Sequence, residues 1–276
     1  MSDTVTFEVP SSRGRRAVTV SYARVGRGEP LLLLHGIGHH RQAWDPVIDI
    51  LATERDVIAV DLPGFGASPS LPDGLTHDLP TMNVALGALC EALELDRPHV
   101  AGNSLGGLLA LELGREKLVR SVTALSPAGF WTQAERRYAF GVLLAMRGSA
   151  RGLPEPFVER LSRTAAGRTV LTSTIYARPG RRSPEAVVAE TLALARSTGF
   201  TETLRAGTDV RFTDDVPGLP VTVAWGTKDR LLLRRQGVRA KGVIPKARLV
   251  RLPGCGHVPM NDDPALVARV ILDGSS

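Results

Sequence analysis

Residues 101–107 read Ala-Gly-Asn-Ser-Leu-Gly-Gly, and the rest of the chain is interpreted around this stretch. The apolar residues before it predict a strand, and the apolar run 108–111 after it predicts a helix. A serine at a tight strand-to-helix turn needs small neighbours, which Gly102 and Gly106 provide. Such a turn would lift the Ser104 hydroxyl above the sheet and place a helix N-terminus beneath it. This arrangement suits a nucleophile whose attack creates an oxyanion.

The Gly-x-Ser-x-Gly pattern is weak when it stands alone. It occurs by chance, and it also fits a glycine-rich turn between a strand and a helix in any fold with alternating strands and helices. The residues elsewhere in the chain therefore have to decide between a nucleophile and a structural turn.

Strand and helix patterns alternate along most of the chain. Apolar runs predict buried strands at 31–34 and 57–60, and further strands are expected at 98–101, 122–125, 221–225 and 248–252, with helical patterns between most of them. Residues 7–9 and 17–22 alternate apolar and polar side chains and predict an edge hairpin, with a turn over 11–16. The fold class is therefore α/β, with a mostly parallel sheet and helices on both faces.

The alternation stops between Gly129 and Gly207, where helical patterns follow one another without a clear strand and only 169–176 is ambiguous. We interpret 129–207 as an inserted helical cap. Residues 1–128 and 208–276 would then form one α/β core.

Composition limits the partners that this chain of 276 residues is expected to have. The net charge is +6, but the arginines are scattered, which is typical of a solvated surface. Aromatic residues make up 5%, too few for a nucleic-acid stacking surface, and two cysteines do not make a disulfide framework. The N-terminus lacks the apolar segment of a signal peptide, and no apolar run approaches ~20 residues. We expect a cytoplasmic enzyme with a small-molecule substrate and neither a membrane nor a nucleic-acid partner; a homo-oligomer is left open.

A nucleophilic serine needs a general base and a carboxylate that orients this base. We look for both at the carboxyl ends of strands, because active sites lie there in open parallel sheets. Of the six histidines, His257 alone follows a late strand in a glycine-rich loop. Asp229 ends the strand before it, whereas the strand at 122–125 is followed by Ser126 and Pro127 and offers no carboxylate. The order Ser104, Asp229, His257 is that of nucleophile-elbow enzymes. Agreement in position and order favours a catalytic triad over a chance motif.

Five motifs resemble those of the α/β-hydrolase superfamily across nearly the whole chain. They are His35-Gly36-Ile37-Gly38, the run Asp61 to Ser68, Gly102 to Gly107, Trp225-Gly226-Thr227-Lys228-Asp229, and Gly254-Cys255-Gly256-His257-Val258-Pro259. The resemblance implies an eight-stranded sheet with a helical cap after the sixth strand. It also implies an oxyanion hole formed by the backbone N–H groups of Leu105 and Ile37. The position of Leu105 at a helix start points the same way, whereas Ile37 rests on the resemblance.

These features predict a serine hydrolase that cleaves a carboxylic ester through an acyl-enzyme, without a metal or organic cofactor. Asn103 before the nucleophile keeps open a C–C bond hydrolase of ring-fission products, although Val258 stands where those enzymes often carry an aromatic residue. A perhydrolase, an acyltransferase and a ligand receptor of the same fold are further alternatives. Epoxide hydrolases and haloalkane dehalogenases have an aspartate at the position of Ser104. His35 and Asp61 are interpreted as loop-holding residues.

The cap is expected to determine the substrate. Its large apolar side chains are candidates for the pocket wall: Phe130, Trp131, Tyr138, Phe140, Leu143, Leu144, Met146, Phe157, Leu161 and Tyr176. Its arginines, such as Arg136, Arg137, Arg147 and Arg151, are interpreted as solvated surface.

Overall fold

The computed structural model describes residues 3–12 and 14–276, and their core is one eight-stranded sheet. The strands lie in the order β1-β2-β4-β3-β5-β6-β7-β8. Their bounds are β1 Asp3–Ser11, β2 Gly14–Gly26, β3 Glu29–Leu34, β4 Arg55–Val60, β5 His99–Asn103, β6 Ser121–Leu125, β7 Val221–Gly226 and β8 Arg248–Leu252. All pairs from β4 to β8 are parallel, and only β1 with β2 and β2 with β4 are antiparallel. The predicted fold class is confirmed.

The N-terminal hairpin lies at the predicted edge of the sheet, but its strands are longer than predicted. Cross-strand pairing continues as far as Ser11 opposite Gly14, so the connection is shorter than the predicted turn over 11–16. Arg13 of that turn lies outside the described residues, as do Met1 and Ser2. Pairing of Tyr22 with Val60 joins the hairpin to the parallel part of the sheet.

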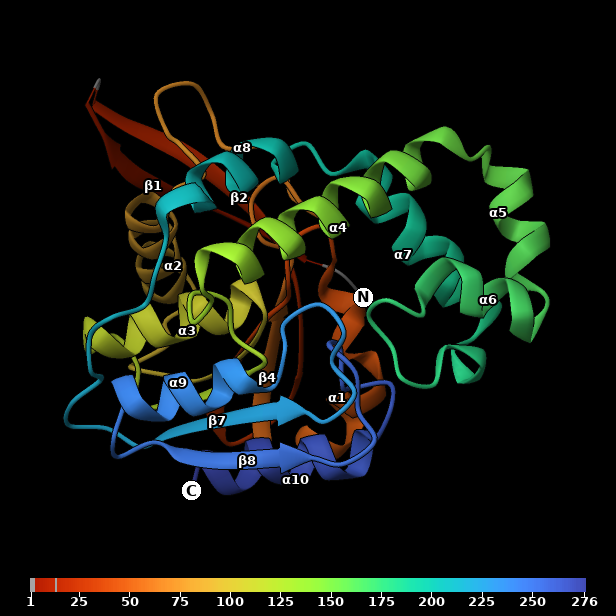
Figure 1. The fold of residues 1–276 in the computed structure, drawn as a ribbon. Helices are drawn as coiled ribbons and strands as arrows, with labels where there is room; N and C mark the ends of the chain where they lie inside the picture. Colours follow the sequence, from red (N-terminus) through yellow and green to blue (C-terminus); the bar gives the residue numbers. More distant parts are fainter. Residues whose placement is uncertain (1–2, 13) are drawn as a thin grey trace.

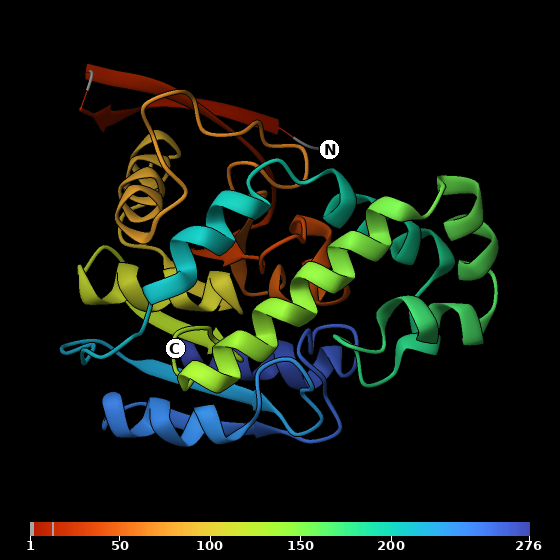
Figure 2. The ribbon, with the colours of Figure 1, turned by 45° about the horizontal axis from the view of Figure 1, so that its top comes forward.

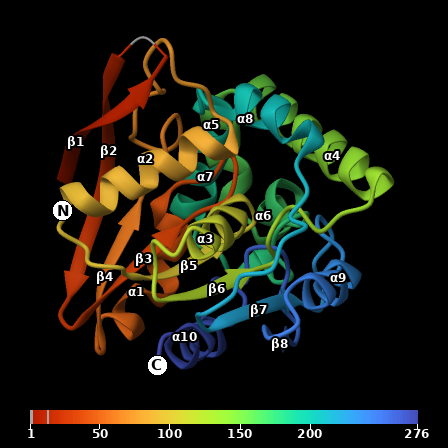
Figure 3. The ribbon, with the colours of Figure 1, turned by 90° about the vertical axis from the view of Figure 1, so that its left-hand side faces the viewer.

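Helices cover both faces of the sheet, as Figure 3 shows. One face carries α1 (Asp45–Leu51) and α10 (Pro264–Gly274), and the other carries α2 (Leu79–Ala92), α3 (Leu105–Arg115) and α9 (Arg235–Val243). Strand β3 is apolar at successive positions because helices cover it on both faces. Leu32 and Leu34 pack towards α2 and α3, whereas Leu31 and Leu33 pack towards α1 and α10, and all four are buried.

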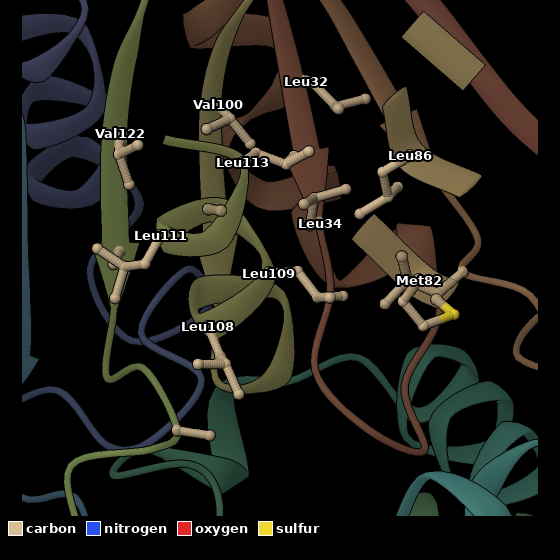
Figure 4. Packing of buried hydrophobic residues seen from close by; sticks show 14 of the residues in the cluster. Leu32, Leu34, Met82, Leu86, Val100, Leu108, Leu109, Leu111, Leu113 and Val122 are labelled. Carbon is tan, nitrogen blue, oxygen red and sulfur yellow. The ribbon is translucent and has the colours of Figure 1, made fainter. Parts of the chain in front are cut away.

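Helix α3 is the best-buried helix next to the central strands. Figure 4 shows its leucines packed against β3, β5, β6 and α2: Leu108, Leu109, Leu111 and Leu113 meet Leu32, Leu34, Val100, Val122, Met82 and Leu86. Each fully buried leucine contributes about 1.5–3 kcal/mol through the hydrophobic effect. This packing fixes the start of α3, and with it the residue that precedes the helix.

Five α-helices are inserted between β6 and β7, in agreement with the predicted position of the cap: α4 Gln133–Gly152, α5 Glu155–Ser162, α6 Ala165–Thr172, α7 Pro184–Arg196 and α8 Phe200–Ala206. The ambiguous stretch 169–176 therefore begins as helix and contains no strand. Helices α5, α6 and α7, drawn in green to teal, extend to one side of the sheet (Figure 1). Helices α4 and α8 lie side by side in Figures 1 and 2. The two helices are in contact through Arg147 of α4, whose guanidinium carbon lies 4.6 Å from the centre of the Phe200 ring of α8. None of the helices described here is both long and apolar enough to cross a membrane.

The turn between β5 and α3 depends on two close backbone approaches. A Cβ on Gly102 would lie 2.0 Å from the Gly106 carbonyl oxygen, and a Cβ on Gly106 would lie 2.1 Å from the Leu34 carbonyl oxygen. Both obstacles are backbone atoms, one in helix α3 and one in strand β3, and neither can move aside cheaply.

We predict that Gly106→Ala lowers the free energy of unfolding by at least about 3 kcal/mol, because the added methyl overlaps the β3 backbone. Gly148→Ala is the matched control, since a Cβ there meets no atom within 4 Å in the helix α4. It should raise stability by roughly 0.5–1 kcal/mol through helix propensity. Urea unfolding of the three proteins measures both effects. Equal stabilities of Gly106→Ala and the unsubstituted protein would contradict the packing argument.

Candidate active site

Ser104 is held in a strained backbone conformation between β5 and α3. Its φ of 57° and ψ of −114° are unusual for a residue with a side chain. The surrounding backbone keeps it there: its N–H donates to the Leu125 carbonyl (3.0 Å), and its carbonyl accepts from the N–H groups of Leu108 and Ala128 (3.0 Å each). The strain is thus offset by hydrogen bonds to β6, α3 and the segment after β6.

Asp229 and His257 meet through a hydrogen bond at the carboxyl ends of β7 and β8. His257 Nδ1 lies 2.8 Å from Asp229 Oδ2, and both side chains are buried. The other carboxylate oxygen, Oδ1, accepts from the N–H groups of Leu231 (2.9 Å) and Leu232 (2.8 Å). The carboxylate is therefore fixed at both ends. As the acceptor at Nδ1, it favours the tautomer that carries its proton there and leaves Nε2 as the free base.

Ser104 and His257 line the same cavity, which opens to solvent. Its empty volume, including the open entrance, is about 510 Å³. The structure thus brings two sequence-predicted residues to one cavity and hydrogen-bonds the third to one of them. A second, more apolar cavity of about 760 Å³ also reaches Ser104. Ile37 lines both cavities, and Leu105 lines the second.

The backbone N–H groups of Leu105 and Ile37 have no hydrogen-bond acceptor among residues 3–12 and 14–276. Leu105 is the first residue of α3, where helical N–H groups lack intrahelical partners. The loop that carries Ile37 passes close to the serine, since a Cβ on Gly36 would lie 3.2 Å from Ser104 Cβ. Both groups are thus available to an anion formed next to Ser104.

Asn103 connects the serine turn to the histidine loop, a role that the sequence did not reveal. Its amide nitrogen donates to the backbone carbonyls of Leu125 (3.0 Å) and His257 (2.9 Å), and the side chain is buried. Both hydrogens of the amide are therefore used within the protein. The only sequence signal was its position directly before Ser104.

Asp262 was also missed, and it fixes the other side of the histidine loop. Its carboxylate accepts from the N–H groups of Gly256 (2.8 Å), Ala177 (3.0 Å) and Arg178 (2.8 Å). Two of these donors belong to the helical insertion, so Asp262 joins the insertion to the residue before His257. In the sequence nothing distinguishes it from its neighbour Asp263, whose side chain caps α10.

His35 and Asp61 hold loops, in line with their interpretation from sequence. His35 Nδ1 is 2.7 Å from the Gly36 carbonyl, and its Nε2 accepts from the Leu62 N–H (3.0 Å). Asp61 accepts from the backbone N–H groups of Arg41 and Ala67 and pairs with the Arg41 guanidinium. Burial of the ring lowers the pKa of His35 to about 4.

The predicted wall residues of the insertion lie in four different environments. Trp131, Phe140 and Leu143 line the apolar cavity, and Leu143 and Met146 line the cavity with His257. Phe130 and Tyr176 are buried in packing, whereas Tyr138, Leu144 and Phe157 are largely exposed. Leu161 lies with Phe157 at a separate groove between the helices of the insertion.

Comparisons with known proteins identify the family and the fold of this chain. A model described as "Alpha/beta hydrolase family" matches residues 31–270. The chain is 26% identical over 236 residues to Lipase 3 of Moraxella sp. (strain TA144), which covers 84% of this chain and 73% of the lipase.

Two solved structures share the fold. One is a thermophilic esterase of Thermogutta terrifontis, with a TM-score of 0.77, 21% identity, and 98% of this chain and 97% of the esterase covered. The other is a meta-cleavage product hydrolase of Pseudomonas fluorescens IP01, with a TM-score of 0.73, 20% identity and 96% of each chain covered. At such identities the likeness concerns the fold alone.

Burial of the His35 ring predicts that acid destabilises the folded protein. Unfolded chains protonate histidine near pH 6.5, whereas the folded pKa of His35 is about 4, so below pH 6.5 the unfolded state binds a proton that the folded state refuses. The contribution of His35 to the free energy of unfolding is fully present above pH 6.5 and decreases as the pH falls towards 4. Between pH 7.5 and 5 we expect a loss of about 2 kcal/mol in the free energy of unfolding.

Urea unfolding across this pH range measures the loss, with His35→Gln as the comparison. The variant should be less stable at pH 7.5 but should lose less stability on acidification, since it lacks the titrating ring. Equal pH dependence in the two proteins would show that His35 titrates normally when folded.

Proposed function

The chain belongs to the alpha/beta hydrolase family, and we propose that it is a serine hydrolase that cleaves carboxylic esters with Ser104, His257 and Asp229 as its catalytic triad. The observation that carries the proposal is the site geometry. Ser104 and His257 line one cavity, and the Asp229 carboxylate holds His257 Nδ1. The Moraxella relative is a lipase, which supports ester cleavage over other reactions of the family.

The first half of the proposed reaction forms an acyl-enzyme. His257 Nε2 takes the Ser104 hydroxyl proton as the serine oxygen attacks the ester carbonyl, and Asp229 stabilises the resulting imidazolium. The N–H groups of Leu105 and Ile37 donate to the oxyanion, each contributing ~3 kcal/mol by analogy with measured oxyanion holes. His257 then gives its proton to the leaving alcohol oxygen as the C–O bond breaks.

The second half repeats these steps with water. His257 removes a proton from a water molecule, the resulting hydroxide attacks the acyl carbon, and the proton returns to Ser104 as the carboxylic acid leaves. The same groups serve both halves, and no step calls for a cofactor.

A C–C bond hydrolase is the second candidate. It is favoured by Asn103 before the serine and by the shared fold with the meta-cleavage product hydrolase. Two observations weigh against it: Val258 follows His257, and the Asn103 amide hydrogens are already bound to two backbone carbonyls. Turnover of p-nitrophenyl esters without bleaching of a dienol-ketone supports the ester assignment, and the reverse result supports C–C cleavage.

Ser104→Ala should reduce kcat/KM for a p-nitrophenyl ester by at least about 10⁴-fold, because it removes the nucleophile. It should also abolish labelling by a serine-directed phosphonate. The matched control is Ser126→Ala, which removes another buried serine at the carboxyl end of the adjacent strand β6. Undiminished turnover by Ser104→Ala, or labelling lost in Ser126→Ala alone, would refute the nucleophile assignment.

Asp229→Asn tests the orienting carboxylate. An asparagine oxygen can still accept from Leu231 and Leu232, but its NH₂ then faces His257 Nδ1 and favours the wrong tautomer. We expect kcat to fall by roughly 10⁴-fold with little change in stability. Asp263→Asn is the control, because asparagine caps α10 equally well and activity should persist. Similar activities of the two variants would exclude Asp229 from the triad.

A further inference from the structure

A row of buried polar side chains leads from the loop after β3 into the helical insertion. His39, Tyr176, Arg182 and Glu190 form it, and each is at least nine-tenths buried. None of the four takes part in the proposed triad or oxyanion hole. The end of the row is Glu190 of α7, which lines the same cavity as Ser104 and His257.

The hydrogen bonds in this row fix the orientation of the Glu190 carboxylate. His39 Nδ1 accepts from the His40 N–H (3.0 Å), so the proton of the neutral ring is on Nε2, which lies 3.4 Å from the Tyr176 hydroxyl. That hydroxyl donates to Glu190 Oε1 (2.9 Å). Arg182 donates to the same oxygen through Nε (2.7 Å) and Nη2. Glu190 Oε1 is therefore supplied with three donors.

Glu190 Oε2 has no hydrogen-bond partner among the residues that the structure describes, although it is buried. A buried carboxylate oxygen without a donor destabilises a protein, and such an atom calls for an explanation. A donor on a bound ligand would satisfy it, because Glu190 borders the cavity in which the substrate reacts.

The surrounding charges favour a neutral donor over a cation. The Arg182 guanidinium pairs with Glu190 and cancels its charge. Burial keeps the pKa of His39 well below its usual range, so this ring is uncharged at neutral pH. A hydroxyl group suits such a site better than an ammonium group, which would be desolvated there without a net opposite charge.

The direction of proton transfer assigns the two cavities to the two parts of an ester. The leaving alcohol must lie beside His257, because His257 protonates its oxygen. His257 lines only the cavity that also contains Glu190, whereas the apolar cavity is lined by residues such as Leu108, Trp131 and Phe140. The acyl group therefore belongs in the apolar cavity and the alcohol in the cavity with Glu190.

We propose that the substrate is an ester of an apolar acid with a short alcohol that carries a second hydroxyl, and that Glu190 Oε2 accepts a hydrogen bond from this hydroxyl. This inference rests on the proposed ester hydrolysis and adds the class of alcohol. Glu190 is then a specificity residue that contacts the leaving group.

The test uses two hexanoate esters of nearly equal size, the 2-hydroxyethyl ester and the propyl ester. Their kcat/KM ratio is divided by the ratio of their hydroxide-catalysed hydrolysis rates, which removes intrinsic reactivity. We expect the protein to prefer the hydroxyethyl ester at least about tenfold on this corrected scale, as for other polar groups paired within a site. A corrected ratio near one overturns the inference.

Glu190→Gln refines the test, because its amide can keep an oxygen towards Arg182 and Tyr176 while its NH₂ replaces Oε2. The corrected ratio should fall to about one or below, since a donor then faces the substrate hydroxyl. Damage to the fold would lower both rates and leave their ratio unchanged. Glu185→Gln, an exposed position on the same helix, is the matched control and should keep the preference.

The outcomes separate this inference from the proposed function. If neither ester is hydrolysed and the phosphonate does not label Ser104, ester hydrolysis itself fails. If both esters are hydrolysed with a corrected ratio near one, or if Glu190→Gln keeps the full preference, ester hydrolysis stands and the role of Glu190 is rejected.

Discussion

Parallel pairing of the central strands is the constraint on which the site depends. The register sets Gly102 of β5 opposite Ala124 of β6, Ala124 opposite Val223 of β7, and Val223 opposite Leu249 of β8. The carboxyl ends of these strands therefore reach the same edge of the sheet, and the loops that follow them converge there. Residues far apart in the chain meet because their strands are neighbours. The geometry of the proposed triad is a product of sheet register rather than of local sequence.

Sequence reasoning identified features that local patterns determine. The strand-turn-helix around Ser104 and the insertion after β6 both follow from residue spacing and turn residues. Asp229 and His257 were predicted as site residues because each stands at the end of a strand. Asn103, Asp262 and Glu190 could not be assigned in this way, since their partners are set by tertiary packing. Asn103, for example, meets His257 across 154 positions of the chain.

The sheet and the insertion contribute differently to the site. The sheet edge supplies Ser104, Asp229 and His257, and the start of helix α3 supplies the unpaired N–H group of Leu105. The insertion supplies apolar walls and the buried carboxylate of Glu190. In the proposed reaction, chemistry and substrate choice are thus carried by separate parts of the chain, a division that allows one fold to host many functions.

Asp262 affects how far the sequence of the insertion can change without disturbing the loop that carries His257. It holds the insertion through the backbone N–H groups of Ala177 and Arg178 and holds the histidine loop through the backbone of Gly256. Main-chain donors are present whichever side chains occupy those positions, proline excepted. The hydrogen bonds that link the insertion to the histidine loop therefore tolerate changes of side chain at these positions. Mutations can reshape the walls of the cavity that contains Glu190 while the His257 imidazole stays in place.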